Sequence, residues 1–398
     1  MMQRSLFRHL GWMTAVFFFA VLSTPACSQS PAYSSSSQEA SILFETPTSD
    51  LQALIEQYPV AQPFLPFIKY DVRAHRITYT TTYRGEPATA SGVILIPQGR
   101  SEPAPLLIWN HGTTFNKLDV ASEWTNGEHI ELVPATAGFI TFLPDYVGYG
   151  ASKHLLHPYM IQEPLVVSII DMIGAGKEYL RAQNVAFDDR LYLWGFSEGG
   201  YATLAVQKEI ESNPAHGLAI TASYPVAGPY DLKETLDIIF SKDRYVGAGY
   251  LAYVFAAYND TFWMRPYTDF FQEPIATKVE QLAAGQFPLH EIGDVLTASL
   301  AGFMNPTFLE HYRSGGEEQV QAAFSANSDF DWTPQSPTYL YHGTADADVP
   351  FEIGQAIYES FIARGADPET VHFIPVEGMD HNASGVAALL AFLQKEER

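Results

Sequence analysis

Cysteine and basic residues are both scarce in this chain of 398 residues. The only cysteine is Cys27. One thiol can form neither an internal disulfide framework nor a thiolate metal site, so the sequence excludes disulfide-rich proteins and proteins built around a cysteine-ligated metal. Lysine and arginine number 22 against 45 aspartates and glutamates, which gives a formal net charge of −23. Such a surface repels phosphate backbones, and we therefore expect no nucleic-acid partner.

Long apolar runs are missing too, apart from one near the amino terminus. Residues 10–22 are apolar, follow two arginines and end in small residues before Cys27. The run is too short for a membrane span and has the order of an export signal, so we expect residues 1–27 to be a signal peptide. Acylation of Cys27 would anchor the protein to a bacterial cell envelope. Because Pro25 is unusual at such a site, cleavage to a secreted or periplasmic protein stays open.

The remaining chain has no internal repeats and no blocks of like charge. Residues 28–50 are polar and of low complexity, and we expect them to form a flexible tether. Residues 51–398 are expected to form one globular domain. The hydrophobic fraction of the chain, 47%, is ample for a large core.

Strand-like and helix-like segments alternate along this domain, which favours a mostly parallel sheet covered by helices. Two of the strands, 73–83 and 88–96, are expected to form an antiparallel hairpin joined at residues 84–87. Further strands are predicted at 105–110, 138–143, 190–196, 219–225, 337–342 and 370–376. Helices are predicted at 163–182 and at 383–395. A further helix is predicted to begin at the serine motif described below and to end at about residue 213.

The most informative motif is Gly195-Phe196-Ser197-Glu198-Gly199, which lies between an apolar run and a helix-like segment. A strand, a tight turn and a helix with serine at the apex hold the hydroxyl clear of the backbone, where it can act as a nucleophile. Small residues two positions before and after the serine leave room for that turn. The helix directs its first amides and its positive dipole end at the place where an oxyanion would form. The pattern alone is weak evidence, so partner residues must support it.

A nucleophilic serine needs a histidine base, and the histidine needs an orienting carboxylate. After the β-prone run 337–341 comes a loop that contains Asp346 and Asp348, and after the run 371–376 comes a loop that contains His381. Loops at the carboxyl ends of parallel strands are where sites in α/β proteins are built. The chain order serine, acid, histidine is the one that α/β-hydrolases use.

With these motifs the chain resembles the serine α/β-hydrolases of the esterase/lipase type, close to secreted bacterial lipases and prolyl-oligopeptidase-like esterases. The resemblance covers about residues 70–398 and implies a mostly parallel central sheet flanked by helices, with a helical cap insertion and with 51–398 as the catalytic domain. The motifs that match are the serine pentapeptide, Gly343-x-x-Asp346-x-x-Val349-Pro350, Gly378-Met379-Asp380-His381 and Asn110-His111-Gly112-Thr113.

Carried over residue by residue, the resemblance makes Ser197 the nucleophile, His381 the general acid and base, and Asp346 the orienting acid. Asp348 is a rival acid. The family places the acid three residues before the Val-Pro pair, which favours Asp346. Asp331 is a weaker candidate because it precedes the strand instead of following it.

Two amides are expected to form the oxyanion hole. One is the N–H of Glu198, directly after the nucleophile, and the other comes from Thr113 or a close neighbour in the loop after the strand 105–110. Tyr146, in a run that related enzymes carry at this place, is a candidate for contact with the substrate, with a packing role as the equal alternative.

Four polar residues near these motifs are interpreted as structural. His342 and His372 lie in or beside strands, where packed or hydrogen-bonded histidines are common. Asp145 is expected to brace loops by hydrogen bonds, and Asp380 to belong to a loop or a helix cap.

About a hundred residues between Asp231 and Trp332 stand where this fold needs only one helix. We expect a cap insertion at about 232–332. Its many aromatic residues favour an apolar pocket over Ser197, with packing of the cap's own core as the alternative for most of them.

These observations predict a carboxylic ester hydrolase, an esterase or lipase, that works through an acyl-enzyme on a small-molecule ester of apolar character. It needs no metal and no cofactor. The length of the acyl chain and the identity of the alcohol stay open. One alternative is a peptidase or amidase of the prolyl-oligopeptidase type, although the β-propeller repeats usual in that class do not occur here. Another is a non-catalytic surface binding protein on a hydrolase scaffold, which loss of a triad member would mark.

Overall fold

A computed structural model of the chain describes residues 37–283 and 299–397. The expected export signal and Cys27 lie outside these ranges. Within the same ranges, none of the helices combines the length and the hydropathy that crossing a membrane demands.

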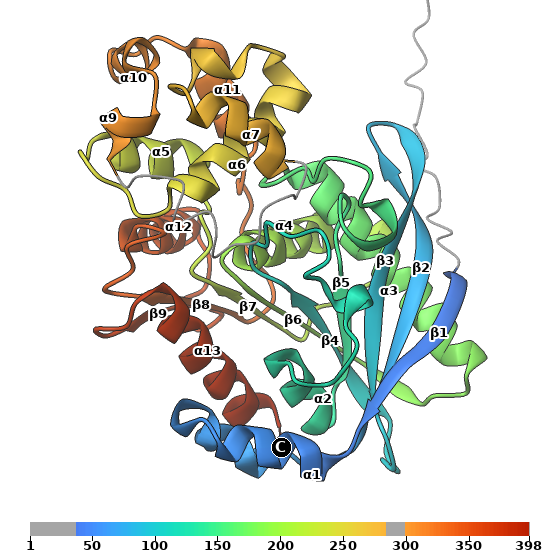
Figure 1. The fold of residues 1–398 in the computed structure, drawn as a ribbon. Coiled ribbons are helices and arrows are strands. Elements are labelled where there is room, and N and C mark those ends of the chain that lie inside the picture. Colours follow the sequence, from blue (N-terminus) through green and yellow to red (C-terminus); the bar gives the residue numbers. More distant parts are fainter. Residues whose placement is uncertain (1–36, 284–298, 398) are drawn as a thin grey trace, which may run out of the picture. The chain divides into compact units, whose positions relative to one another are not determined.

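The fold is built on one nine-stranded sheet of order β1-β2-β3-β5-β4-β6-β7-β8-β9 (Figure 1). Strands β1 to β3 pair antiparallel, and so does β3 with β5, whereas every neighbouring pair from β5 to β9 is parallel. The strands are β1 Ser37–Thr46, β2 Val72–Tyr83, β3 Glu86–Pro97, β4 Ala104–Asn110, β5 Ile140–Pro144, β6 Phe187–Phe196, β7 Ala222–Val226, β8 Thr338–Gly343 and β9 Val371–Val376.

The strand predictions are confirmed, and burial explains why the sequence revealed them. Every residue of β4, β5 and β7 is buried, and strands buried on both faces read as continuous apolar runs. The hairpin of β2 and β3 turns at Arg84 and Gly85, whose φ angles are 54° and 78°. Two residues with positive φ give the turn that best matches the twist of paired strands.

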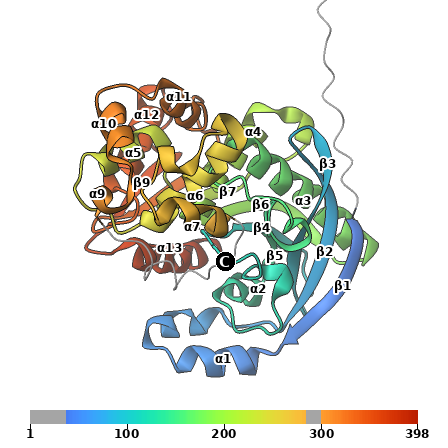
Figure 2. The same ribbon diagram turned by 45° about the horizontal axis from the view of Figure 1, so that its top comes forward.

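Helices cover both faces of this sheet (Figure 2), as the fold prediction requires. Their buried side chains belong to two hydrophobic clusters, one on each face. On one face lie α3 Gln162–Ala182, α4 Glu198–Ser212 and α12 Phe351–Ala363, and on the other α1 Thr48–Glu56, α2 Val133–Thr136 and α13 His381–Glu396. The predicted helices 163–182 and 383–395 correspond to α3 and α13.

The chain between β7 and β8 is helical in its described part, and we call these helices the helical insertion. They gather together on one side of the sheet (Figure 1). The helices are α5 Leu232–Phe240, α6 Ala248–Tyr258, α7 Ile275–Ala283, α9 Leu300–Phe303, α10 Pro306–Arg313 and α11 Glu318–Ala326, with short turns at Asn259–Trp263 and Tyr267–Asp269. Phe255 packs against Phe270, Phe308 and Phe324, so many of the aromatic residues form the insertion's own core.

The predicted tether is wrong for its second half. Residues 37–46 form β1, which pairs with β2 at the edge of the sheet, and α1 begins at Thr48. The half-buried side chains of Leu43 and Phe44 pack on the cluster that includes α1. The short apolar run within 42–44 was the signal for this strand, and the serine-rich residues before it obscured that signal.

One buried carboxyl in α3 predicts how stability depends on pH. Asp171 is 4% exposed, and this burial raises its pKa from 3.8 to about 6. Between these values the folded state binds more protons than the unfolded state, so the wild type loses stability as pH rises through this window. Asp171→Asn removes that loss, which amounts to at most about 3 kcal/mol.

The check is the free energy of unfolding in urea at pH 4 and pH 8. We expect Asp171→Asn to gain stability relative to the wild type between the two pH values. Glu178→Gln changes an exposed acid on the same helix and serves as the control. An equal pH response in wild type and Asp171→Asn would contradict the account.

Candidate active site

Ser197 lies at a sharp turn between β6 and α4, as the motif predicts. Its backbone has φ 59° and ψ −118°, a conformation that a residue with a side chain adopts only under constraint. Gly199 packs so closely that a Cβ atom there would lie 1.9 Å from the Asn110 carbonyl oxygen, and a Cβ on Gly195 would lie 2.1 Å from the oxygen of Gly199. The predicted need for small residues on both sides of the serine is therefore confirmed.

Asp346 and His381 meet from the loops that follow β8 and β9. The Nδ1 atom of His381 lies 2.6 Å from Oδ2 of Asp346, and both side chains are buried. The other carboxylate oxygen, Oδ1, accepts the backbone N–H groups of Asp348 and Val349, each at 2.9 Å. These three contacts fix the position of the Asp346 carboxylate, and the carboxylate in turn orients the imidazole of His381.

His342 is a second histidine at the same carboxylate. Its Nε2 lies 3.3 Å from Oδ2 of Asp346 and 3.1 Å from the Val349 carbonyl oxygen, and its side chain is fully buried. Burial by itself would raise the pKa of Asp346, but hydrogen bonds from His342 and His381 outweigh it and hold that pKa well below its ordinary value. The carboxylate is therefore ionised, which keeps a hydrogen on Nδ1 of His381 and leaves Nε2 free to accept a proton.

The other acids near the motif have different surroundings. The carboxyl of Asp348 borders the cavity described below, while its backbone N–H supports Asp346. Asp331 forms an ion pair with Arg364. Asp380 caps α13, because its Oδ1 accepts the N–H of Ala383 at 2.9 Å, so the capping interpretation is confirmed.

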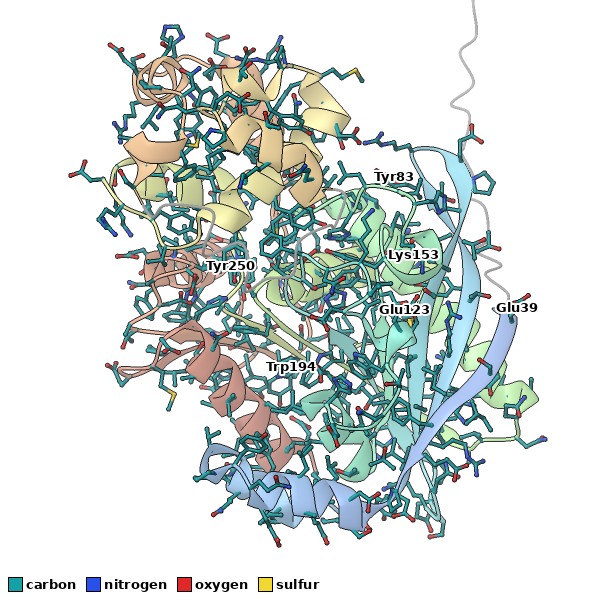
Figure 3. All side chains as sticks on the ribbon, viewed as in Figure 1. Glu39, Tyr83, Glu123, Lys153, Trp194 and Tyr250 are labelled. Atoms are coloured by element: carbon teal, nitrogen blue, oxygen red, sulfur yellow. The ribbon has the colours of Figure 1, made fainter. Side chains whose placement is uncertain are left out.

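Ser197 and His381 line the same cavity, which has a volume of about 60 Å³. Most of its wall is apolar, and α5 and α6 of the helical insertion supply the largest share of the lining residues. Tyr250 of α6 lies on the side of the insertion that faces the sheet (Figure 3). The apolar side chains of the wall are Met160, Pro229, Leu232, Leu236, Ile239, Leu251, Val254, Phe324 and Val349.

The loop after β4 reaches Ser197. A Cβ atom on Gly112 would lie 3.7 Å from Cβ of Ser197 and 3.3 Å from the carbonyl oxygen of Phe196. Thr113 follows directly, and its hydroxyl is 2.8 Å from that of Tyr159. Glu198 is the first residue of α4, where backbone N–H groups have no partner within the helix. The two residues expected to supply amides therefore flank Ser197.

Tyr146 and Asp145 support this loop. Tyr146 is fully buried, stacks on the ring of His111 and donates its hydroxyl to the His111 carbonyl at 3.1 Å. The substrate contact suggested for Tyr146 stays a prediction. The bracing expected of Asp145 is confirmed: its carboxyl accepts the Ser91 hydroxyl at 2.6 Å and the Ser122 N–H at 3.1 Å.

His157 was not found from the sequence. Its Nε2 lies 2.6 Å from Oε1 of Glu198, and both side chains have no exposed surface. The signal that could have led to it is Glu198 itself. A charged residue beside a nucleophile, in an otherwise apolar helix start, requires a buried partner.

The fold places the chain among the α/β-hydrolases, and comparison with known proteins places it within them. The model of the secretory lipase family matches residues 117–395, which is more than half of the chain. The chain belongs to this family.

Proteins similar to this chain include a lipase, an esterase and a putative hydrolase. The secreted triacylglycerol lipase LIP2 of Malassezia globosa is 26% identical over 333 residues, which cover 76% of this chain and 67% of that lipase. The cell wall degrading esterase LipA of Xanthomonas oryzae is 27% identical, with a TM-score of 0.77 and coverage of 90% of this chain and 95% of LipA. A putative hydrolase of Legionella pneumophila has a TM-score of 0.83 at 26% identity and covers 91% of this chain and 98% of its own.

Family and neighbours together show that this chain is an enzyme, a carboxylic ester hydrolase. The peptidase and binding-protein alternatives thereby lose their support. Membership of a secretory family also supports the expected export.

Proposed function

We propose that the enzyme hydrolyses apolar carboxylic esters through Ser197 as nucleophile, His381 as general acid and base, and Asp346 as orienting acid. The observation that carries the proposal is the 2.6 Å contact between Asp346 and His381, at the wall of a cavity that Ser197 shares. The ionised carboxylate favours the tautomer of His381 that this chemistry needs.

In this mechanism, Nε2 of His381 takes the hydroxyl proton as Oγ of Ser197 attacks the ester carbonyl carbon. The N–H groups of Glu198 and Thr113 stabilise the oxyanion. The C–O bond to the alcohol breaks, and the alcohol leaves with the proton from His381. A water molecule, deprotonated by the same imidazole, then attacks the acyl-enzyme, and the acid and free Ser197 are released.

We further propose that the acyl group occupies the apolar cavity and is short. A volume of about 60 Å³ is far below the roughly 300–1,000 Å³ of pockets that enclose drug-sized ligands. The helical insertion acts as the cap in this proposal. Lipid attachment through Cys27 remains a prediction from sequence alone.

A ladder of p-nitrophenyl esters from acetate to palmitate tests the proposal. We expect hydrolysis with an optimum at a short chain, near butyrate. No hydrolysis at any length by the folded protein would contradict the ester hydrolase, whereas an optimum at palmitate would contradict only the short acyl pocket.

Leu236→Ala enlarges the cavity from the side of α5. We expect the preference for longer chains to rise, measured as the kcat/KM ratio of octanoate to butyrate, by about four-fold for each methylene newly buried, since each contributes about 0.8 kcal/mol. Leu300→Ala is the matched control, because Leu300 is as well buried in the helical insertion but lies outside the described cavity wall. Equal ratios in the two variants would place the acyl chain elsewhere.

A further inference from the structure

The side chain of Glu198 has no part in the chemistry described so far, yet it is buried directly after the nucleophile. Its Oε1 lies 2.6 Å from Nε2 of His157, whose Nδ1 lies 2.7 Å from the Val147 carbonyl oxygen. A carbonyl can only accept, so Nδ1 carries a hydrogen, and a further proton lies between Glu198 and His157. Burying two such groups costs more free energy than burying an apolar pair, so a specific role is expected.

His157 belongs to the segment 146–159, which also holds the loop after β4. Tyrosine hydroxyls of this segment form hydrogen bonds with three residues of the loop. The bonds run from Tyr146 to the His111 carbonyl at 3.1 Å, from Tyr149 to the Thr114 carbonyl at 2.6 Å, and between Tyr159 and the hydroxyl of Thr113 at 2.8 Å. The position of the Thr113 amide therefore depends on where the segment lies.

The segment is tightly packed around His157. Gly148 has φ 96°, and a Cβ atom there would lie 2.4 Å from Cα of His157. The tyrosines are buried, and burial, followed by the nearby Glu198 carboxyl, raises the pKa of Tyr146 well above its ordinary value. Their hydroxyls keep their protons and can donate to the loop.

We propose that Glu198 and His157 are positioning residues that fix the two amide donors of the oxyanion hole relative to each other. Glu198 carries one donor on its backbone, and its side chain holds the segment that holds Thr113. Oxyanion stabilisation depends on donor positions to within a fraction of an ångström, so a loosened link lowers the rate of the chemical step. The inference rests on the proposed function, because it assumes catalysis at Ser197.

Kinetics of Glu198→Leu and Tyr146→Phe, singly and together, test this link with p-nitrophenyl butyrate. We expect Glu198→Leu to lower kcat roughly 10- to 100-fold with little change in KM. Tyr146→Phe removes a single hydroxyl and lowers kcat less. Because both changes loosen the same link, the double variant is expected to be no worse than Glu198→Leu alone.

Two further variants separate positioning from general damage. Glu198→Gln keeps a donor for Nε2 of His157 and is expected to recover most of the kcat that Glu198→Leu loses. Glu209→Leu removes the α4 partner of another Glu–His pair, in which His216 of the following turn lies at 2.8 Å, and is expected to behave as the wild type. Circular dichroism and thermal unfolding establish that each variant is folded.

The proposal is overturned if folded Glu198→Leu keeps its kcat, if its loss lies in KM, or if the effects of Glu198→Leu and Tyr146→Phe multiply. It is also overturned if Tyr146→Phe leaves kcat unchanged, a result available even where Glu198→Leu does not fold. Wild type and Ser197→Ala are run in parallel. An inactive wild type removes the proposed function as well, whereas an active wild type with unaffected variants removes only the positioning role.

Discussion

Ser197→Ala is expected to fold as the wild type does and to lose ester hydrolysis by roughly 10⁴- to 10⁶-fold in kcat. The size of the loss follows from the mechanism. Without Oγ no acyl-enzyme can form, and only binding and the amide donors remain to accelerate attack by water. Because the substituted atom points away from the helix core into the cavity, the free energy of unfolding is expected to change little.

Two measurements test this expectation. Steady-state hydrolysis of p-nitrophenyl butyrate gives the loss, and urea unfolding verifies the fold. Ser212→Ala replaces an exposed serine at the other end of α4 and should keep full activity. A Ser197→Ala protein with more than about a hundredth of wild-type turnover would contradict a serine nucleophile at this position.

Asp346→Asn is expected to lower kcat roughly 10⁴-fold at pH 7 with a small effect on KM. The carboxylate accepts hydrogen bonds from His381, from His342 and from two backbone amides. An amide in its place can present its N–H to Nδ1 of His381. The hydrogen then moves to Nε2, which can no longer take the proton of Ser197.

Asp346→Asn also tests how acid acts on stability. The pKa of the Asp346 carboxyl is depressed in the folded wild type. Its contribution to the free energy of unfolding is therefore present above the ordinary carboxyl pKa and is lost as pH falls below that value. We expect the stability difference between wild type and Asp346→Asn to be largest at neutral pH and to shrink below about pH 4.

Asp348→Asn is the matched control for the choice of acid. Asp348 also borders the cavity, but only its backbone N–H contacts Asp346. We expect its kcat to stay within a few-fold of the wild type. A greater loss in Asp348→Asn than in Asp346→Asn would reverse the assignment.

The sequence predicted most of the fold because the fold depends on local patterns. Strands β4 to β7 are apolar runs, and α3 and α13 show helical spacing of apolar residues. The three candidate catalytic residues could be found because each stands in a loop motif after a strand. Edge strand β1 was missed because its apolar run is short and follows a polar, serine-rich stretch. Its side chains Leu43 and Phe44 are also only half-buried in the folded protein.

Contacts between segments that are distant in the chain could not be predicted from the sequence. Glu198 and His157 are 41 positions apart, and nothing in the local pattern links them. His342 was interpreted as structural, and it is buried, but its contact with Asp346 depends on how the loop after β8 turns back. Pairs of this kind are set by tertiary packing, so a sequence can only indicate that a buried charge needs some partner.

The most direct test of the central claim is covalent labelling with a p-nitrophenyl alkylphosphonate. Oγ of Ser197 attacks phosphorus and displaces p-nitrophenolate, which leaves a stable phosphonyl ester on the enzyme. We expect one p-nitrophenolate released for each enzyme molecule, complete loss of ester hydrolysis, and the added mass on the peptide that contains Ser197. A label on another residue, or no label while ester hydrolysis continues, would contradict the account.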